Sequence, residues 1–369
     1  MKSHFLILTL MLCPALCAVA QIKIPKKACE LPNGITIRYH ERGPADGIPV
    51  ILLHGFTDTS RSLYKVAEEL EKLDKGLRII VPDLRGHGNS SMPSESCAAD
   101  PASCFTFSLL SNDIILLMDE LSISKAYIAG HSLGGMIAQE LALKHTNRVH
   151  SVTLIATLLC GSTNDVVQDF VLKEMLNNVM RRAAKEKHLR WPKDVYERTP
   201  ANLGGQVPAF LRQNWVTEPA ADEALLDAIA YETVATRMGT WIGLAKSIRD
   251  FDNRKALEQL AVPALVLYST NDPVYPYGQT QDDFKRSLAA AVRNGNNSIV
   301  YKQYGRNPED RKSDLDLGHN FHWTVPDRVA ADIASFVRTQ KPEPIHTFLD
   351  DSGNVVSVPA TDGALSLLK

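Results

Sequence analysis

Several features that mark specialised proteins are missing or scarce in this chain. No block of lysines and arginines occurs, and 40 Lys+Arg against 42 Asp+Glu give a formal net charge of −2. A basic surface for nucleic acid or for an anionic membrane is therefore not expected. Internal repeats and low-complexity tracts are absent, and only 6 of 369 residues are cysteine. With 44% hydrophobic residues the chain can build a sizeable core without a metal or a disulfide framework.

The first twenty residues differ from the rest. Lys2 precedes an apolar run that includes Phe5 to Leu12, and Ala18-Val19-Ala20 ends it. This pattern predicts a secretory signal peptide over residues 1–20, cleaved before Gln21. A membrane anchor is the alternative, but Pro14 interrupts a run that is barely long enough to cross a bilayer. No second apolar stretch is evident, so we expect a secreted or periplasmic protein without stable membrane insertion.

Cysteine usage agrees with export. Two cysteines lie in the predicted signal peptide, and four remain in the mature chain: Cys29, Cys97, Cys104 and Cys160. Cys97 and Cys104 bound a short polar loop, and in an oxidising compartment they are the candidate disulfide pair. Cys29 and Cys160 fit free, buried thiols, and their pairing is left open.

Short apolar, β-branched runs alternate with helical patterns along most of the chain. Several runs are continuously apolar, which is typical of strands covered on both faces. The alternation predicts an α/β fold with a mostly parallel central sheet and helices on both faces. The predicted strands are Ile35–His40, Val50–His54, Arg78–Pro82, Ala126–Gly130, Ser151–Ile155, Ala264–Ser269 and Ser298–Tyr304. The predicted helices are Leu63–Lys72, Leu109–Leu121, Gly134–Lys144, Gln281–Val292 and Asp327–Thr339.

The alternation stops over residues 158–258, which have helical periodicity and carry Trp191, Trp215 and Trp241. We interpret this stretch as a helical cap over the carboxyl edge of the sheet, where α/β folds bind ligands. A plain helical excursion whose tryptophans fill its own core is the alternative. The cap divides the core into residues 21–157 and 259–342, and a tail, 343–369, follows with a possible hairpin over Thr347–Val358.

The strongest chemical signal is Gly130-His131-Ser132-Leu133-Gly134. An apolar strand leads into it and a helix rich in small residues leads out, which is the context that a G-x-S-x-G pattern requires. A serine on so tight a turn is exposed, and the helix that follows directs its N-terminal N–H groups at developing negative charge. Ser132 is therefore the predicted nucleophile.

A serine needs a general base that a third group orients. His319 follows the last strand of the core and is the predicted base, with His322 as its main competitor. The acid is expected between serine and histidine in the chain, and Asp272 fits directly after a strand. Asp165 is a poorer second choice, and Asp83 ends a strand but precedes the serine.

An acyl-transfer site also needs two N–H donors for the developing oxyanion. One is expected from the backbone of Leu133, directly after the nucleophile. The other is expected from Phe56 in the early loop His54-Gly55-Phe56. His131 is expected to be turned away from the site by the sharp turn.

These segments resemble the α/β-hydrolase superfamily, in the order in which that family carries them. The matching segments are His54-Gly55-Phe56, Asp83-Leu84-Arg85-Gly86-His87-Gly88-Asn89-Ser90, Gly130-His131-Ser132-Leu133-Gly134, Asn271-Asp272-Pro273 and Gly318-His319. The resemblance implies that fold and a Ser-His-Asp triad. It does not fix the substrate, although Ser132 argues against epoxide hydrolases and haloalkane dehalogenases, which use Asp. His54-Gly55-Phe56-Thr57-Asp58 also departs from the HGGPG of proline iminopeptidases.

We therefore expect a serine hydrolase that cleaves a small, mainly apolar carboxylic ester or lactone and that needs no cofactor and no metal. The alternatives are a carbon–carbon bond hydrolase or an acyl transferase with the same triad, and a ligand-binding sensor on a hydrolase scaffold. The oligomeric state stays open.

Overall fold

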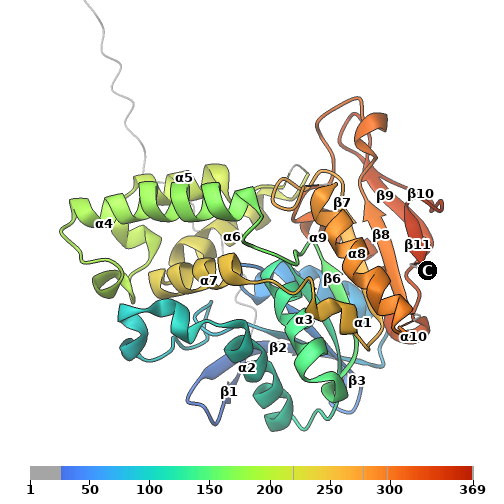
Figure 1. Ribbon diagram of the computed structural model, residues 1–369, viewed down its shortest axis with the longest axis horizontal. Helices are drawn as coiled ribbons and strands as arrows, with labels where there is room; N and C mark the ends of the chain where they lie inside the picture. Colours follow the sequence, from blue (N-terminus) through green and yellow to red (C-terminus); the bar gives the residue numbers. More distant parts are fainter. Residues whose placement is uncertain (1–25, 219, 277, 297, 368–369) are drawn as a thin grey trace, which may run out of the picture.

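The computed structural model describes residues 26–367 except positions 219, 277 and 297. The predicted signal peptide and its cleavage site lie outside the described residues. In the described part, eleven strands form one sheet with helices packed on it (Figure 1).

The sheet is mostly parallel, as the alternating pattern predicted. Its order is β1-β2-β4-β3-β5-β6-β7-β8-β9-β10, and β11 pairs with β8. Neighbours from β4 to β9 are parallel, whereas β1, β2, β10 and β11 join antiparallel. The strands are β1 (Lys27–Glu30), β2 (Thr36–Arg42), β3 (Ile48–Leu53), β4 (Leu77–Pro82), β5 (Ala126–His131), β6 (Val149–Ile155), β7 (Ala264–Ser269), β8 (Ile299–Tyr304), β9 (Ile345–Leu349), β10 (Val355–Pro359) and β11 (Leu365–Leu367).

Helices cover both faces of the sheet, which explains why the central strands are apolar throughout. In β3, Val50 and Leu52 pack with α1 (Tyr64–Leu73) and α10 (Pro326–Thr339) on one face. Ile51 and Leu53 point the other way, into the cluster of α2 (Phe107–Glu120), α3 (Leu133–Lys144) and α8 (Gln279–Arg293). All four side chains are fully buried, because successive residues of a strand face opposite sides of the sheet.

Residues 158–258, the helical insertion, lie between β6 and β7. Their main helices are η5 (Val166–Arg181, a π-helix), α4 (Arg182–Glu186), α5 (Gln206–Asn214), α6 (Glu223–Ala235) and α7 (Met238–Asp250). Figure 1 shows α4 to α7 grouped beside one end of the sheet. Trp241 is fully buried and contacts Phe56 of the sheet domain, with ring centroids 5.2 Å apart. Trp215 reaches the same region, where its Nε1–H donates to the Thr57 hydroxyl at 3.0 Å.

The tail forms the predicted hairpin. Strands β9 and β10 pair antiparallel, with Leu349 opposite Val355. The short strand β1 was not predicted, because Lys27-Ala28-Cys29-Glu30 carries no apolar run. It lies at the exposed edge of the sheet, where pairing with β2 requires only backbone groups.

One expectation about apolar runs is corrected by the structure. The helical stretch Pro101–Glu120, with a mean hydropathy of 1.3, is long and apolar enough by composition to cross a membrane. Over half of that stretch is buried inside the molecule, and α2 packs against α3. It serves as a core helix in this fold.

The structure joins Cys97 and Cys104 in a disulfide, with their Cα atoms 6.1 Å apart. Of the remaining described cysteines, Cys160 is buried and Cys29 is half-buried, and both are free thiols.

Candidate active site

Ser132 lies between β5 and α3 in a conformation that few non-glycine residues adopt, with φ 52° and ψ −115°. Such a backbone costs roughly 1–3 kcal/mol and persists only where the surroundings hold it. Its N–H donates to Ile155 O at 2.9 Å, and the Thr157 hydroxyl donates to Ser132 O at 2.7 Å. These contacts with the end of β6 fix the turn.

The glycines on either side of Ser132 are required by close backbone contacts. A Cβ on Gly130 would lie 2.2 Å from Gly134 O, and a Cβ on Gly134 would lie 2.1 Å from Leu53 O. Only glycine fits at either position. The second contact also sets the start of α3 against the end of β3, next to the loop that carries Phe56.

Asp272 and His319, predicted as acid and base, meet across the ends of β7 and β8. Asp272 Oδ2 lies 2.8 Å from His319 Nδ1. The other carboxylate oxygen, Oδ1, accepts the N–H groups of Val274 and Tyr275 at 2.8 and 2.9 Å. One oxygen of Asp272 is therefore fixed by backbone N–H groups, and the other orients the imidazole of His319. This contact assigns the imidazole proton to Nδ1 and leaves Nε2 as an acceptor.

Ser132 and His319 line the same cavity, and Ser132 is 6% exposed. The side-chain hydrogen bond that the structure gives Ser132 is to Tyr275, with the two hydroxyl oxygens 3.3 Å apart. Burial raises the pKa of Tyr275 well above its usual value, so this phenol is no base at neutral pH. The Tyr275 ring packs edge-on against His319, with centroids 4.9 Å apart. Tyr275 was not predicted, although it follows Asp272 by only three residues.

The two residues predicted as oxyanion donors lie on either side of Ser132 and the cavity: Leu133 directly follows Ser132, and Phe56 lines the cavity. Leu133 is the first residue of α3, and the N–H groups of a first helical turn have no partner within the helix. Phe56 lines the cavity with Gly55, and among the described residues no hydrogen bond is donated by its N–H. Backbone N–H groups without a partner can stabilise a tetrahedral oxyanion, so the pair stays the predicted oxyanion hole.

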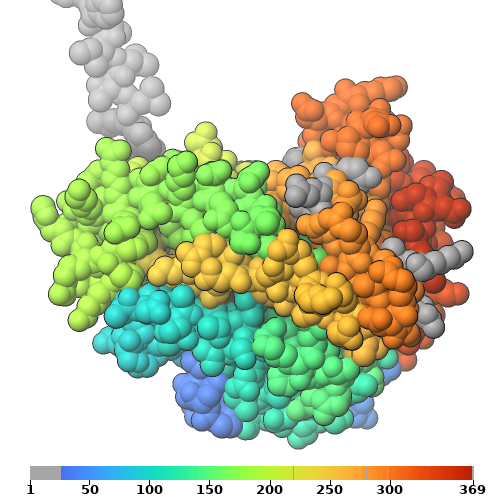
Figure 2. All heavy atoms as spheres, viewed as in Figure 1, coloured from blue at the N-terminus to red at the C-terminus, as the bar shows by residue number. Residues whose placement is uncertain are grey.

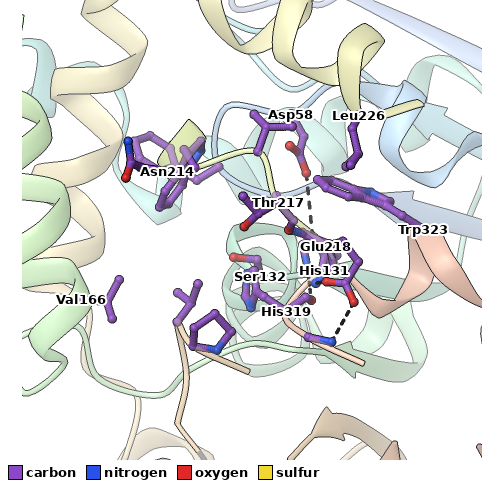
Figure 3. A pocket seen from close by; sticks show the side chains of 18 of the residues that line it. Asp58, His131, Ser132, Val166, Asn214, Thr217, Glu218, Leu226, His319 and Trp323 are labelled. Atoms are coloured by element: carbon purple, nitrogen blue, oxygen red, sulfur yellow. Dashed lines mark hydrogen bonds and ion pairs between the residues drawn. The ribbon is translucent and has the colours of Figure 1, made fainter. Parts of the chain in front are cut away.

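The cavity has a volume of about 710 Å³ and is shared between the sheet domain and the helical insertion. Most of its wall is apolar, with rings from Phe56, Phe170, Trp215 and Trp323. In Figure 2 the surface dips between the green and yellow-green insertion and the orange segments near residue 300. Figure 3 shows Ser132 and His319 together in the cavity, with side chains of the insertion facing them. A cavity of this size and lining suits a small, mainly apolar ligand.

Two carboxyl groups that were not predicted also line the cavity. Burial raises the pKa of Asp58 to about 7. Burial likewise raises the pKa of Glu218 to about 7, against the N–H groups of Gly318 and Asn320, which donate to it. Glu218 belongs to the helical insertion, where no motif singled it out.

His131 does not turn away from the site, contrary to the expectation. It lines the cavity, its Nε2–H donates to His319 O at 3.1 Å, and Asp58 Oδ2 lies 3.9 Å from its Nδ1 (Figure 3). Burial, with His322 and His319 nearby, lowers its pKa well below the usual value, so it stays neutral. The strained turn therefore leaves the side chains of both Ser132 and His131 at the cavity wall.

The competing candidates lie elsewhere. His322 is fully buried beside Trp323 and is not part of the cavity wall. Asp165 is exposed at the start of η5. Asp83 is buried and forms an ion pair with the partly buried Lys26 at 2.7 Å, which ties the N-terminal segment to the end of β4. Within the described residues, no group of three or more His, Cys, Asp or Glu side chains is arranged to hold a metal ion.

Comparison with known proteins identifies the fold and the family of this chain. Lipase 3 from Moraxella sp. (strain TA144) is 26% identical over 249 residues, which are 67% of this chain and 70% of the lipase. An esterase from Exiguobacterium antarcticum superposes with a TM-score of 0.63 at 18% identity and covers 85% of this chain and 99% of its own. The enol-lactonase from Burkholderia xenovorans LB400 superposes with a TM-score of 0.59 at 21% identity. The superposition covers 85% of this chain and 100% of the lactonase. A sequence model of the alpha/beta hydrolase fold matches residues 48–323, and the chain therefore belongs to the alpha/beta hydrolase family.

Proposed function

We propose that this protein is an exported serine hydrolase that cleaves a carboxylic ester or lactone through an acyl-enzyme. The observation that carries the proposal is the arrangement at one cavity. Asp272 holds His319 at 2.8 Å, and Ser132 lies on a strained turn that faces the same space.

The chemistry follows from the orientation of these groups. His319 Nε2 accepts the proton of Ser132 while the serine oxygen attacks the carbonyl carbon. The N–H groups of Leu133 and Phe56 stabilise the oxyanion, and His319 returns the proton to the leaving alcohol. Water, activated by the same imidazole, then releases the acid.

In this arrangement Ser132 Oγ must leave Tyr275 and turn toward His319. Catalytic hydrogen bonds are often long or misaligned before substrate binds. The 3.3 Å contact between the two hydroxyls is a weak hydrogen bond, so this rotation costs little.

The substrate class is proposed from the cavity. Four aromatic rings and a volume of about 710 Å³ favour a bounded, mainly apolar acyl or alcohol group over a polymer. The similarity to a lipase, an esterase and an enol-lactonase supports the same range of ester bonds.

The test is hydrolysis of p-nitrophenyl esters and simple lactones of graded acyl length. Ser132→Ala is expected to lose at least 10³-fold in kcat because the variant lacks the oxygen that attacks the carbonyl, while its circular dichroism spectrum stays unchanged. Labelling by a fluorophosphonate should fail in the same variant. Full activity in Ser132→Ala would refute the mechanism, and a wild-type protein that neither turns over nor labels would favour a sensor.

Export is part of the proposal and rests on the sequence of residues 1–20, with the disulfide Cys97–Cys104 in support. Expression of the full chain should yield a mature form that begins at Gln21, measured by intact-mass spectrometry. A full-length protein that stays with the membrane fraction would favour the anchor.

A further inference from the structure

The backbone on both sides of His319 is bound by one side chain from the helical insertion. Glu218 Oε1 accepts the N–H of Gly318 at 2.7 Å, and Oε2 accepts the N–H of Asn320 at 2.9 Å. The carboxylate thus spans the predicted base, with one oxygen on the residue before it and one on the residue after it. Figure 3 shows Glu218 beside His319 and His131 at the cavity.

The surrounding structure is built for this contact. A Cβ on Gly318 would lie 2.9 Å from Glu218 Oε2, so glycine before the histidine allows the carboxylate to approach the backbone. A third hydrogen bond joins the same segments, because Asn320 Nδ2 donates to Thr217 O at 3.1 Å. On the opposite side, the Nε2–H of His131 donates to His319 O at 3.1 Å.

Among the described residues, Glu218 has no lysine or arginine partner that would compensate for its burial. It is 6% exposed, and among the described residues no ion pair within 4 Å includes it. Arg212, the cation in the same cavity wall, pairs with Glu223 and Asp227 instead. Burying a carboxylate is costly unless hydrogen bonds compensate, and the two backbone N–H groups beside His319 are the hydrogen-bond donors that the structure gives it. The burial therefore serves the position of the histidine loop.

We propose that Glu218 is a positioning residue, through which the helical insertion holds His319 in the position where its imidazole can accept the proton of Ser132. This inference rests on the proposed function of the triad. It makes the insertion a structural part of the catalytic base, in addition to a wall of the cavity. Movement of the insertion relative to the sheet then displaces His319 together with it.

The test compares Glu218→Gln and Glu218→Ala with Glu197→Gln, a matched control on the same insertion. Glu197 is 46% exposed, and the ion pair that it forms among the described residues is with Arg237 at 3.0 Å. In Glu218→Gln one oxygen still accepts a backbone N–H, but the NH₂ group faces the other backbone N–H and cannot accept it. Glu218→Ala removes both acceptors. A 1 Å misplacement of a catalytic group costs about 100-fold, so we expect kcat to fall about tenfold in Gln and about 100-fold in Ala. KM should change less than about threefold, because binding to the apolar wall is kept.

Rates are normalised to fluorophosphonate-labelled sites, so a loss of folded protein does not imitate a loss of kcat. A second readout is the low-field proton signal of a histidine Nδ1–H bonded to a carboxylate, assigned by its absence in Asp272→Asn. This signal should broaden in both Glu218 variants and stay sharp in Glu197→Gln. If Glu218→Ala is insoluble, Asn320→Ala takes its place, because it removes the hydrogen bond to Thr217. We expect it to lower kcat and to broaden the proton signal, each to a smaller extent than Glu218→Ala would.

Glu218 variants with a lower melting temperature but wild-type kcat and a sharp signal would overturn the inference and leave the proposed function intact. If the wild type hydrolyses no ester and does not label, the proposed function fails. The proton signal still decides whether Glu218 positions His319.

Discussion

Replacing Asp272 by asparagine isolates the role of the acid without removing a side chain. In the wild type, Asp272 Oδ1 accepts two backbone N–H groups, from Val274 and Tyr275, and Oδ2 faces His319 Nδ1. An asparagine must turn its only oxygen to the two N–H groups, because an NH₂ there would meet two donors. Its NH₂ group then faces His319 Nδ1.

This exchange of donor and acceptor reverses the tautomer of His319. With an NH₂ donor opposite, Nδ1 becomes the acceptor and the proton moves to Nε2, which can no longer accept the proton of Ser132. The corresponding change in a serine protease triad lowers kcat about 10⁴-fold, equivalent to about 5–6 kcal/mol. We expect a loss of that order here, with little change in KM.

The assay is steady-state hydrolysis of a p-nitrophenyl ester by wild type, Asp272→Asn and Asp165→Asn at neutral pH. Asp165 is the second acid that the sequence allowed, and it is exposed outside the cavity, so its variant should keep wild-type activity. Retention of more than a tenth of the wild-type kcat in Asp272→Asn would refute the assignment. A large loss in Asp165→Asn would move the acid to that position.

Three further predictions concern stability. Gly134→Ala should cost at least about 1–3 kcal/mol and most of the activity, because its Cβ would lie 2.1 Å from Leu53 O; urea denaturation and ester hydrolysis measure both, and a wild-type midpoint would contradict the close packing. Replacing Cys97 and Cys104 by serine should lower the free energy of unfolding by about 2–3 kcal/mol, since only a short loop is closed, while kcat is kept; a variant as stable as wild type would show that the disulfide contributes nothing. Burial lowers the pKa of His322 from 6.5 to about 3. Below pH 6.5 the unfolded chain therefore binds a proton that the folded chain does not, and the free energy of unfolding decreases as the pH is lowered. This group alone should remove about 2 kcal/mol between pH 7.5 and pH 5, and urea melts of His322→Phe should lack that part of the decrease; an identical pH dependence in the variant would contradict the buried, neutral state.

Much of the fold was predictable because its signals are local. The central strands of a parallel sheet are covered on both faces, and apolar runs such as Val50 to Leu53 report that directly. The helical insertion was visible as an interruption of the strand pattern. Strand β1 was missed because an edge strand pairs through its backbone and needs no apolar side chain.

At the candidate site, residues in recognisable motifs were predicted and residues without a motif were not. Ser132 directly follows β5 and Asp272 comes shortly after β7, so their place at one edge of the sheet is set by the order of strands and turns. Tyr275 and Glu218 have no such signal. They are found only when the ends of β7 and β8 and the insertion are packed together.

The sequence by itself therefore determined the α/β architecture and proposed Ser132, Asp272 and His319 as the triad, since each proposal depends on local pattern and chain order. The tertiary structure alone decided the contacts between segments far apart in the chain. Glu218 lies 100 residues from Gly318, and a hydrogen bond across that separation leaves no periodicity to read. The same holds for the cavity wall, whose shape depends on where the insertion packs. The pattern around Ser132 predicts that a serine attacks, whereas the packing of the insertion shapes the cavity wall and brings Glu218 to the backbone beside His319.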